Sequence, residues 1–386
     1  MKTNLTILTL FLALFSVKML SAKANKEPDF SWDKIPVCIH LASKTDFSEE
    51  QLKFMAKFPI ICLEKTQGVG VYGNMEKGTQ VAAQGIKKYN TNSKVLFYWN
   101  SRIDYGDVYS FGSILEKKPE WIMKDAKGEA ITVHAQKRLT YNPMIKEFRD
   151  WWVSVPTEQL NKDKNLDGVF VDAVLQYLAS PAAKIKAEGK EKYDKTLEGV
   201  YSMLTEMRKN IGDDKLIVAN SLRGLEKTFP NMGLDFYDYI DAGMMEHFCA
   251  LSAEDKDVIV KDIALIQEAA KRGKAVIVKG WPTFNFANMG ELKHSSQKSL
   301  EQQAMRDITF PLACFLVAAG EKSYFCYSWG YNENQGGLID YPEYNRALGK
   351  PKADAKKDGY VYTREFEHCS VWVDIASREA MINWKN

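Results

Sequence analysis

Short apolar runs recur along the chain, and polar or turn-forming residues bound each of them. The runs are nearly continuous rather than alternating, which is typical of parallel strands covered on both faces. Segments with helical periodicity lie between most of them, so strand and helix follow one another along the chain. The eight predicted strands are residues 37–41, 60–63, 95–99, 168–171, 216–219, 242–245, 275–278 and 323–327.

Helical patterning is clearest in four segments, at 48–57, 145–159, 196–210 and 253–272. The first opens with a capping sequence at Ser48, and the last ends before Gly273, a residue type that commonly stops helices. This alternation fits either a closed barrel or an open doubly wound sheet. A dinucleotide-binding sheet would carry a glycine-rich loop after its first strand, and this sequence has none there. We therefore predict an α/β fold, a (β/α)8 TIM barrel.

Three more β-rich runs, at 360–366, 370–375 and 380–384, follow the last barrel strand. They predict a small C-terminal β-appendage packed on the barrel, reached through an exposed loop at 353–359. The expected organisation is a signal peptide at 1–24, a catalytic (β/α)8 barrel at 25–352 and C-terminal β-strands at 353–386.

The N-terminus has the pattern of a cleaved secretory signal. Lys2 precedes an apolar stretch at 5–17, and the small-x-small sequence at 22–24 suits signal peptidase. A membrane anchor is the alternative, but Lys18 interrupts a stretch already shorter than the roughly 20 apolar residues that span a bilayer. We expect a secreted or periplasmic protein with no membrane span after the signal is removed.

The amino-acid composition limits the kinds of molecule that this protein is expected to bind. Apolar residues make up 45% of the chain and charged residues 26%, which is typical of a globular protein with a large core. Because 52 basic residues nearly balance 50 acidic ones, no overall field recruits nucleic acid or an anionic membrane. The six cysteines lack C-x-x-C spacing and favour buried hydrophobes, with a single disulfide as the alternative. The five histidines lack metal-ligand spacing, so we expect neither a metal nor a cofactor.

Candidate chemistry lies where polar residues end apolar strands, since the active sites of these barrels form at the carboxyl ends of the strands. Asp172 ends the predicted fourth strand, and Glu246 follows the sixth at the same level of the barrel. Two such carboxyls can flank one glycosidic bond as nucleophile and acid/base. Glu64 follows the second strand, where Lys65 offers a salt-bridge partner, so we expect it to bind substrate or to be structural.

Amides, cations and aromatic rings follow the other strands, a mixture that suits a sugar. For any single ring, loop packing is the alternative. His247 is expected to point away from Glu246 if the strand continues. His40, Arg223 and Lys279 indicate a carbohydrate with an anionic group. The predicted substrate-binding residues are His40, Glu64, Trp99, Asn100, Arg102, Asn220, Arg223, His247, Lys279, Trp281 and Trp329, with Tyr331 two positions further on.

The segment from Tyr141-Asn142-Pro143 through Trp151-Trp152 to the strand 166–172 resembles the corresponding part of retaining α-glycosidases of family 31 and its clan D. That resemblance implies that Asp172 is the nucleophile and Glu246 the acid/base. Nearly the whole mature chain, including the segment 364–384, resembles the fifteenth family of hypothetical glycoside hydrolases. Clan D enzymes usually carry aspartate at strand six, where this chain has Glu246.

We therefore expect a secreted, retaining glycoside hydrolase that cleaves O-glycosidic bonds in an oligo- or polysaccharide without a cofactor. Two alternatives remain open at this point. One is a carbohydrate-binding protein that uses the barrel as a scaffold. The other is a polysaccharide lyase that acts on uronic acids with Lys279 or His247 as the base.

Overall fold

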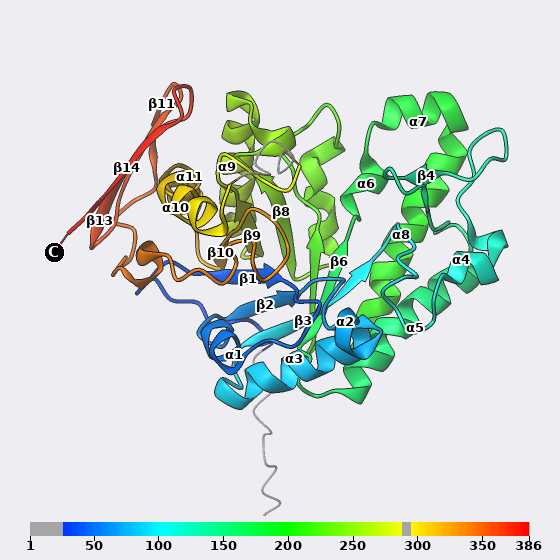
Figure 1. Ribbon diagram of the computed structural model, residues 1–386. Helices are drawn as coiled ribbons and strands as arrows, with labels where there is room; N and C mark the ends of the chain where they lie inside the picture. The colour runs from blue at the N-terminus through cyan, green and yellow to red at the C-terminus, as the bar shows by residue number, and fades with distance from the viewer. Residues whose placement is uncertain (1–25, 288–294, 386) are drawn as a thin grey trace, which may run out of the picture.

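The computed structural model describes residues 26–287 and 295–385, so the signal peptide expected at 1–24 lies outside the described residues. Eight parallel strands form one sheet in the order β1-β2-β3-β6-β7-β8-β9-β10 (Figure 1). The first and last strands meet, because Phe325 N–H donates to the Pro36 carbonyl at 2.7 Å and Ala42 N–H donates to the Tyr331 carbonyl at 2.7 Å. The sheet therefore curls into a nearly closed barrel, which confirms the predicted fold class.

Every predicted strand is present, and several extend further at their carboxyl ends than their apolar runs do. The extensions add polar residues such as Asn100, Asp172 and Asn220 to the ladder, because the neighbouring strand supplies backbone partners there. The barrel strands are β1 (Cys38–Leu41), β2 (Ile60–Leu63), β3 (Lys94–Asn100), β6 (Gly168–Asp172), β7 (Leu216–Asn220), β8 (Ala242–Phe248), β9 (Ala275–Gly280) and β10 (Ser323–Tyr327).

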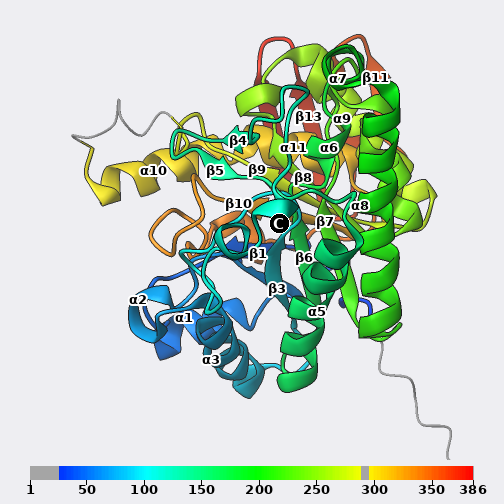
Figure 2. The same cartoon turned by 90° about the vertical axis from the view of Figure 1, so that its right-hand side faces the viewer.

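The helices cover the outside of the barrel, and Figure 2 shows α5 and α8 along the flank formed by β3 and β6. All four predicted helices are present, as α1, α5, α8 and α9. A hairpin of β4 (Thr132–Val133) and β5 (Arg138–Leu139) projects from the long connection between β3 and α5. The helices are α1 (Glu49–Met55), α2 (Val69–Tyr72), α3 (Met75–Tyr89), α4 (Ile114–Lys117), α5 (Lys146–Lys162), α6 (Leu175–Leu178), α7 (Pro181–Glu188), α8 (Lys190–Ile211), α9 (Lys256–Lys271), α10 (Gln297–Asp307) and α11 (Thr309–Ala318).

The alternation of strand and helix departs from the expected repeat in two places. Residues 221–241, all of them described, connect β7 to β8 through 3₁₀ turns at Pro230–Asp238 without an α-helix. Gly233 explains part of this shape, since its φ is +88° and a Cβ there would lie 1.7 Å from the Ser221 carbonyl oxygen. After β10, the described chain continues into the C-terminal sheet rather than into an α-helix.

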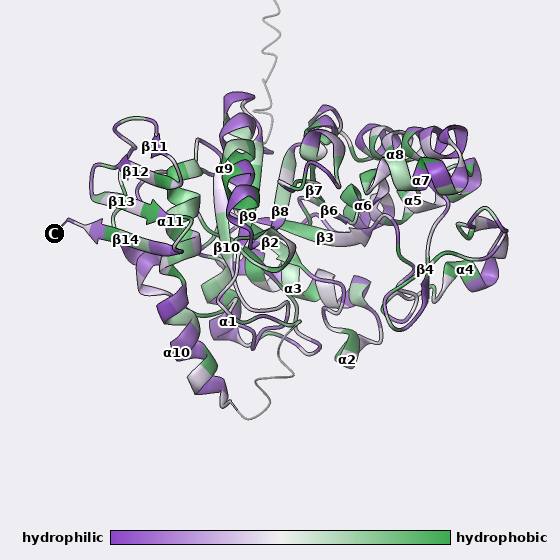
Figure 3. Cartoon of the chain, turned by 90° about the horizontal axis from the view of Figure 1, so that it is seen from above, coloured by the Kyte–Doolittle hydropathy of each residue, from purple (hydrophilic) through white to green (hydrophobic). Residues whose placement is uncertain are grey.

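The C-terminal appendage is an antiparallel sheet of β11 (Lys356–Asp358), β12 (Val361–Glu365), β13 (Cys369–Asp374) and β14 (Glu379–Trp384). Strand β11 lies inside the segment that was predicted as a loop. All three of its residues are exposed and none is apolar, so the hydrophobic pattern did not predict a strand there. Figure 3 shows the strongly apolar α11 between this sheet and the barrel. Residues Pro311–Ala318 of that helix are all buried, so the appendage shares its core with the barrel.

Two further features of the described chain bear on its class. No helix within the described ranges is long and apolar enough to cross a membrane. All six cysteines are buried and unpaired.

Arg364 on β12 ties the appendage to the barrel. It is 8% exposed, and its Nη1 donates to the carbonyls of Leu316 at 2.9 Å and Ala319 at 2.5 Å, at the carboxyl end of α11. Its Nε donates to the Ala353 carbonyl at 3.2 Å. The carbonyls of Leu316 and Ala319 lie at the end of α11, where intrahelical donors run out, so the guanidinium satisfies groups that would otherwise be buried without partners.

Replacing Arg364 with Met keeps the apolar stem and removes the donors. We expect the free energy of unfolding to fall by about 3 kcal/mol, because buried carbonyls lose their partners. Urea unfolding monitored by circular dichroism measures this loss. The exposed Lys352→Met variant serves as control and should change stability by less than about 0.5 kcal/mol. If Arg364→Met caused the appendage to unfold in a separate early transition and left the main transition unchanged, that result would contradict a core shared by the appendage and the barrel.

Candidate active site

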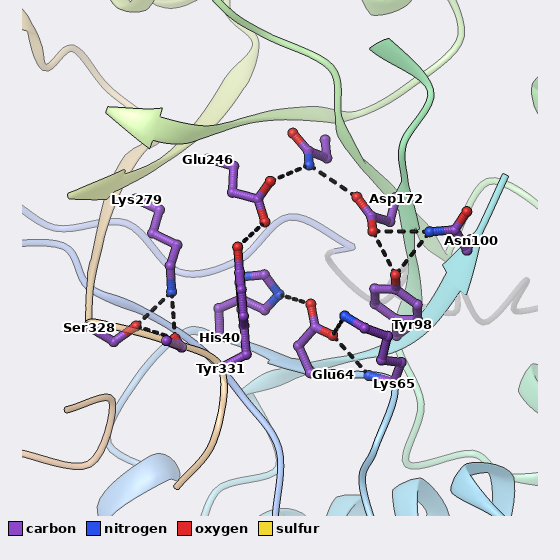
Figure 4. Close-up of polar contacts among 12 residues, drawn as sticks. His40, Glu64, Lys65, Tyr98, Asn100, Asp172, Glu246, Lys279, Ser328 and Tyr331 are labelled. Atoms are coloured by element: carbon purple, nitrogen blue, oxygen red, sulfur yellow. Dashed lines mark hydrogen bonds and ion pairs between the residues drawn. The ribbon is translucent and has the colours of Figure 1, made fainter. Parts of the chain in front are cut away.

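Two carboxyl groups meet at the carboxyl end of the barrel, with one amide between them (Figure 4). Asp172 ends β6 and Glu246 lies on β8, and Asn220 ends the intervening strand β7. Asn220 Nδ2 donates to Asp172 Oδ1 at 3.0 Å and to Glu246 Oε2 at 2.8 Å. Since one nitrogen lies 3.0 Å and 2.8 Å from them, these two oxygens are less than about 6 Å apart.

Asp172 is held by four donors. Its Oδ2 accepts hydrogen bonds from Tyr98 Oη at 2.6 Å and Asn100 Nδ2 at 3.1 Å. Its Oδ1 accepts from Ala173 N at 2.7 Å, in addition to Asn220. An ionised carboxylate has about four acceptor positions, so these donors match them and fix its orientation. Burial and the negative charges of Glu246 and Glu64 nevertheless raise the pKa of Asp172 above its usual value.

Glu246 lies among aromatic and cationic groups. Its Oε1 accepts from Tyr331 Oη at 2.7 Å, and its backbone carbonyl accepts from Trp281 Nε1 at 2.7 Å. Burial raises the pKa of Glu246, but His247, the Tyr331 hydrogen bond and the Arg223 charge outweigh it, so the pKa lies below its usual value. The two carboxyls are close enough that ionising one makes ionising the other less favourable, so their protonation is linked.

His247 does not point away from Glu246, contrary to the expectation from strand alternation. Its Nε2 lies 3.6 Å from Glu246 Oε2, and its Nδ1 lies 3.2 Å from Ser252 Oγ. The ladder between β8 and β9 shifts register between Met245 and Phe248, and such an irregularity redirects side chains. Burial and the Arg223 charge lower the pKa of His247 to about 4, so the ring is neutral near neutral pH.

Glu64 forms a second polar group on the other side of the barrel mouth. Its Oε1 lies 2.9 Å from His40 Nε2, and its Oε2 accepts from Lys65 Nζ at 2.9 Å and Lys65 N at 3.0 Å. Burial raises the pKa of Glu64, but the Lys65 charge and the His40 hydrogen bond hold it well below its usual value. Glu64 is therefore ionised, and it adds a fixed negative charge that acts on Asp172.

Lys279 braces Tyr331 from beneath. It is fully buried, and its Nζ donates to Ser328 Oγ at 2.6 Å and to the Gly330 carbonyl at 3.1 Å. The same ammonium lies 4.7 Å from the centroid of the Tyr331 ring and 4.5 Å from that of Trp281. Figure 4 shows Tyr331 edge-on between Lys279 and Lys65, so cations flank the ring that binds Glu246.

Arg223 is a buried cation with little direct pairing. It is 6% exposed, its Nη1 reaches Ser252 Oγ only at 3.4 Å, and its Nε has no partner among the described residues. Burial lowers the pKa of Arg223, and the charge of Glu246 opposes that effect. The guanidinium therefore retains donor capacity close to the carboxyl pair.

Three of the predicted binding residues lie away from the pair. Trp99 alternates with Tyr98 and Asn100 along β3, so it faces outward and donates from Nε1 to the Trp152 carbonyl at 3.0 Å. Arg102 lines a separate small cavity with Lys184. Trp329 is 1% exposed and packs against Phe284, with 5.4 Å between the ring centroids.

Tyr98 and Lys65 contact Asp172 and Glu64, respectively, and were not among the binding residues predicted from the sequence. The alternation of β3 would have found Tyr98, because it shares a face with Asn100. Lys65 was considered only as a partner for Glu64, whereas its ammonium also lies 5.2 Å from the Tyr98 ring centroid.

The described residues also form a cavity away from the carboxyl pair, but no candidate metal site. A cavity of about 590 Å³ opens near Pro36, Pro59 and Ser93, at the amino ends of the strands and therefore at the opposite end of the barrel from the carboxyl pair. Within residues 26–287 and 295–385, no group of three or more His, Cys, Asp or Glu side chains is arranged to hold a metal ion.

Several solved glycosidase structures are similar to this chain. A noncanonic maltogenic α-amylase from Thermotoga neapolitana has 11% identity over 85% of this chain and 80% of its own, with a TM-score of 0.46. A family 36 α-galactosidase from Geobacillus stearothermophilus has 12% identity over 89% of this chain and 48% of its own, with a TM-score of 0.47. A family 31 dextranase from Flavobacterium johnsoniae, complexed with glucose, has 11% identity over 80% of this chain and 38% of its own, with a TM-score of 0.45. The chain thus spans less than half the length of the last two.

No curated protein matches the chain in sequence. The profile described as hypothetical glycosyl hydrolase family 15 matches residues 87–370, a segment that runs from the end of α3 to β13 and contains both carboxyl groups and the bridging Asn220. The match covers well over half of the chain, and the chain belongs to hypothetical glycosyl hydrolase family 15.

Proposed function

We propose that this glycoside hydrolase is a retaining enzyme in which Asp172 is the nucleophile and Glu246 the acid/base. The observation that carries the proposal is the pair of hydrogen bonds from Asn220, which keeps the nearest carboxyl oxygens less than about 6 Å apart. Retaining glycosidases hold their carboxyls about 5–5.5 Å apart, whereas inverting enzymes need about 6.5–9.5 Å to admit a water molecule. The bridge therefore favours retention.

In the first step, Asp172 attacks the anomeric carbon while Glu246 gives its proton to the glycosidic oxygen, so a glycosyl ester forms as the leaving sugar departs. In the second step, Glu246 takes a proton from water, and the resulting attack on the same carbon releases Asp172. Each carboxyl returns to its starting protonation state.

The assignment of roles rests on the hydrogen bonds to each group. Four donors orient Asp172 for attack, whereas among the described residues the carboxylate of Glu246 receives hydrogen bonds only from Tyr331 and Asn220. Burial and the nearby acids raise the pKa of Asp172, and the pKa of Glu246 is lowered, whereas the first step needs the proton on Glu246. We propose that the reaction starts from the form of the pair in which Glu246 holds the proton and Asp172 is ionised.

The proposed substrate is an oligo- or polysaccharide with an anionic group, a carboxylate or a sulfate. Arg223 supports this, because it is buried near Glu246 with an unpaired Nε. His40, Glu64 and Asn100 would help to orient the sugar at the opposite side of the site. We also propose export, on the basis of the signal peptide expected at 1–24.

The first test is hydrolysis of a panel of 4-nitrophenyl glycosides and of neutral, sulfated and uronic oligosaccharides. On the oligosaccharides, whose leaving group needs protonation, we expect Asp172→Asn and Glu246→Gln each to lose at least about a thousandfold in kcat/KM, with the exposed Glu120→Gln unchanged as control. Added azide should restore turnover of Asp172→Gly as a glycosyl azide of inverted configuration, and of Glu246→Ala as one of retained configuration. If instead Asp172→Gly gave the retained azide and Glu246→Ala the inverted one, Glu246 would be the nucleophile and Asp172 the acid/base.

The alternatives give different products in the same panel. An unsaturated sugar that absorbs in the ultraviolet would identify a lyase, and glycan binding without any product would identify a binding protein. Equal turnover of neutral and anionic members would contradict the anionic substrate.

A second test separates the roles by pH. The Tyr331 hydrogen bond lowers the pKa of Glu246, so Tyr331→Phe should raise that pKa by about one unit. If Glu246 must be protonated for the first step, the alkaline limb of kcat/KM against pH moves upward. A shift of the acidic limb instead would mean that Glu246 acts ionised, as a nucleophile does. Tyr341→Phe is the control, because its buried hydroxyl has no partner among the described residues.

A further inference from the structure

Phe286, on the connection after β9, is an aromatic ring exposed beside the carboxyl pair. It is 44% exposed, and it is the one aromatic among the large exposed hydrophobic residues of the described chain; the others are Val71, Met305 and Met381. Exposing a phenylalanine to water is unfavourable, and isolated cases need no explanation. The position of this ring, however, connects it to the site.

Phe286 is the outer member of a cluster of three rings. Its centroid lies 5.6 Å from that of Trp281 and 5.5 Å from that of Tyr331. Trp281 is 3% exposed and Tyr331 is half-buried, so Phe286 is the most exposed ring of the three. The cluster therefore supports one rigid aromatic surface at the barrel mouth.

The two inner rings both bind Glu246. Tyr331 donates to its carboxylate, and Trp281 donates to its backbone carbonyl, each at 2.7 Å. Neither ring has a hydrogen bond to Asp172. Phe286 thus lies on the Glu246 side of the pair, which in the proposed mechanism is the side of the leaving group.

We propose that Phe286 forms a binding subsite for the sugar on the leaving-group side of the scissile bond. The exposed ring takes the apolar face of a pyranose, which presents C–H groups to an aromatic face. Burying the ring against the sugar removes apolar surface of both partners from water. This inference rests on the proposed function, since the leaving-group side is defined by Glu246 as acid/base.

The test compares two substrates of the sugar that the panel identifies. One is its disaccharide, which fills the leaving-group subsite, and the other is its glycosyl fluoride, which has no leaving sugar. Phe286→Ala should lower kcat/KM for the disaccharide about tenfold, mainly through KM, and change that for the fluoride by less than about twofold. Phe286→Tyr should restore the disaccharide activity, and the exposed Met381→Ala should leave both unchanged.

Equal losses on both substrates, or none on either, would overturn the subsite and leave the proposed function standing. Absence of turnover in the whole panel would count against the proposed function, and binding then tests the subsite independently. In gels that contain dextran, starch, pectin or carrageenan, Phe286→Ala should lose the retardation that the wild type and Met381→Ala show. Equal mobility of Phe286→Ala and the wild type, or a wild type that no glycan retards, would overturn the proposal.

Discussion

A single amide nitrogen holds two carboxyl groups together at the mouth of the barrel, and the rest of the site depends on that contact. Asn220 Nδ2 has two hydrogens and uses one for Asp172 and one for Glu246. The strand order β6-β7-β8 makes this possible, because the middle strand places its last residue between the ends of its neighbours. The separation of the acids is thus set by the sheet rather than by mobile loops.

Bringing two acids together in a buried place has an electrostatic cost that the surroundings offset. Glu64 adds to the repulsion, and the ammonium of Lys65, which pairs with it, offsets part of that effect at Asp172. On the other side, Arg223 and Lys279 place positive charge near Glu246 and under the ring of Tyr331. These charges lower the cost of holding two acids in one buried place, which acid/base chemistry at a single bond requires.

The pattern of apolar runs predicted the barrel and the position of Asp172 and Glu246 at the ends of its strands, because a carboxyl at the end of a buried strand differs sharply from its apolar neighbours. Their catalytic roles stay a prediction. The bridging role of Asn220 was not readable, since it depends on which strands pair. The orientation predicted for His247 was wrong, because the register shift between β8 and β9 has no signature in the local sequence. Tyr331 and Glu246 are 85 positions apart, and only the closure of the barrel brings them into contact.

The most direct measurement of the central claim is the anomeric configuration of the first product, followed by proton NMR before mutarotation. The separation of less than about 6 Å is shorter than the roughly 6.5–9.5 Å of inverting enzymes, so we propose that Asp172 itself, rather than a water molecule, attacks in the first step. The account therefore predicts that the released sugar first appears with the same anomeric configuration as the substrate. Initial release of the opposite anomer would contradict it.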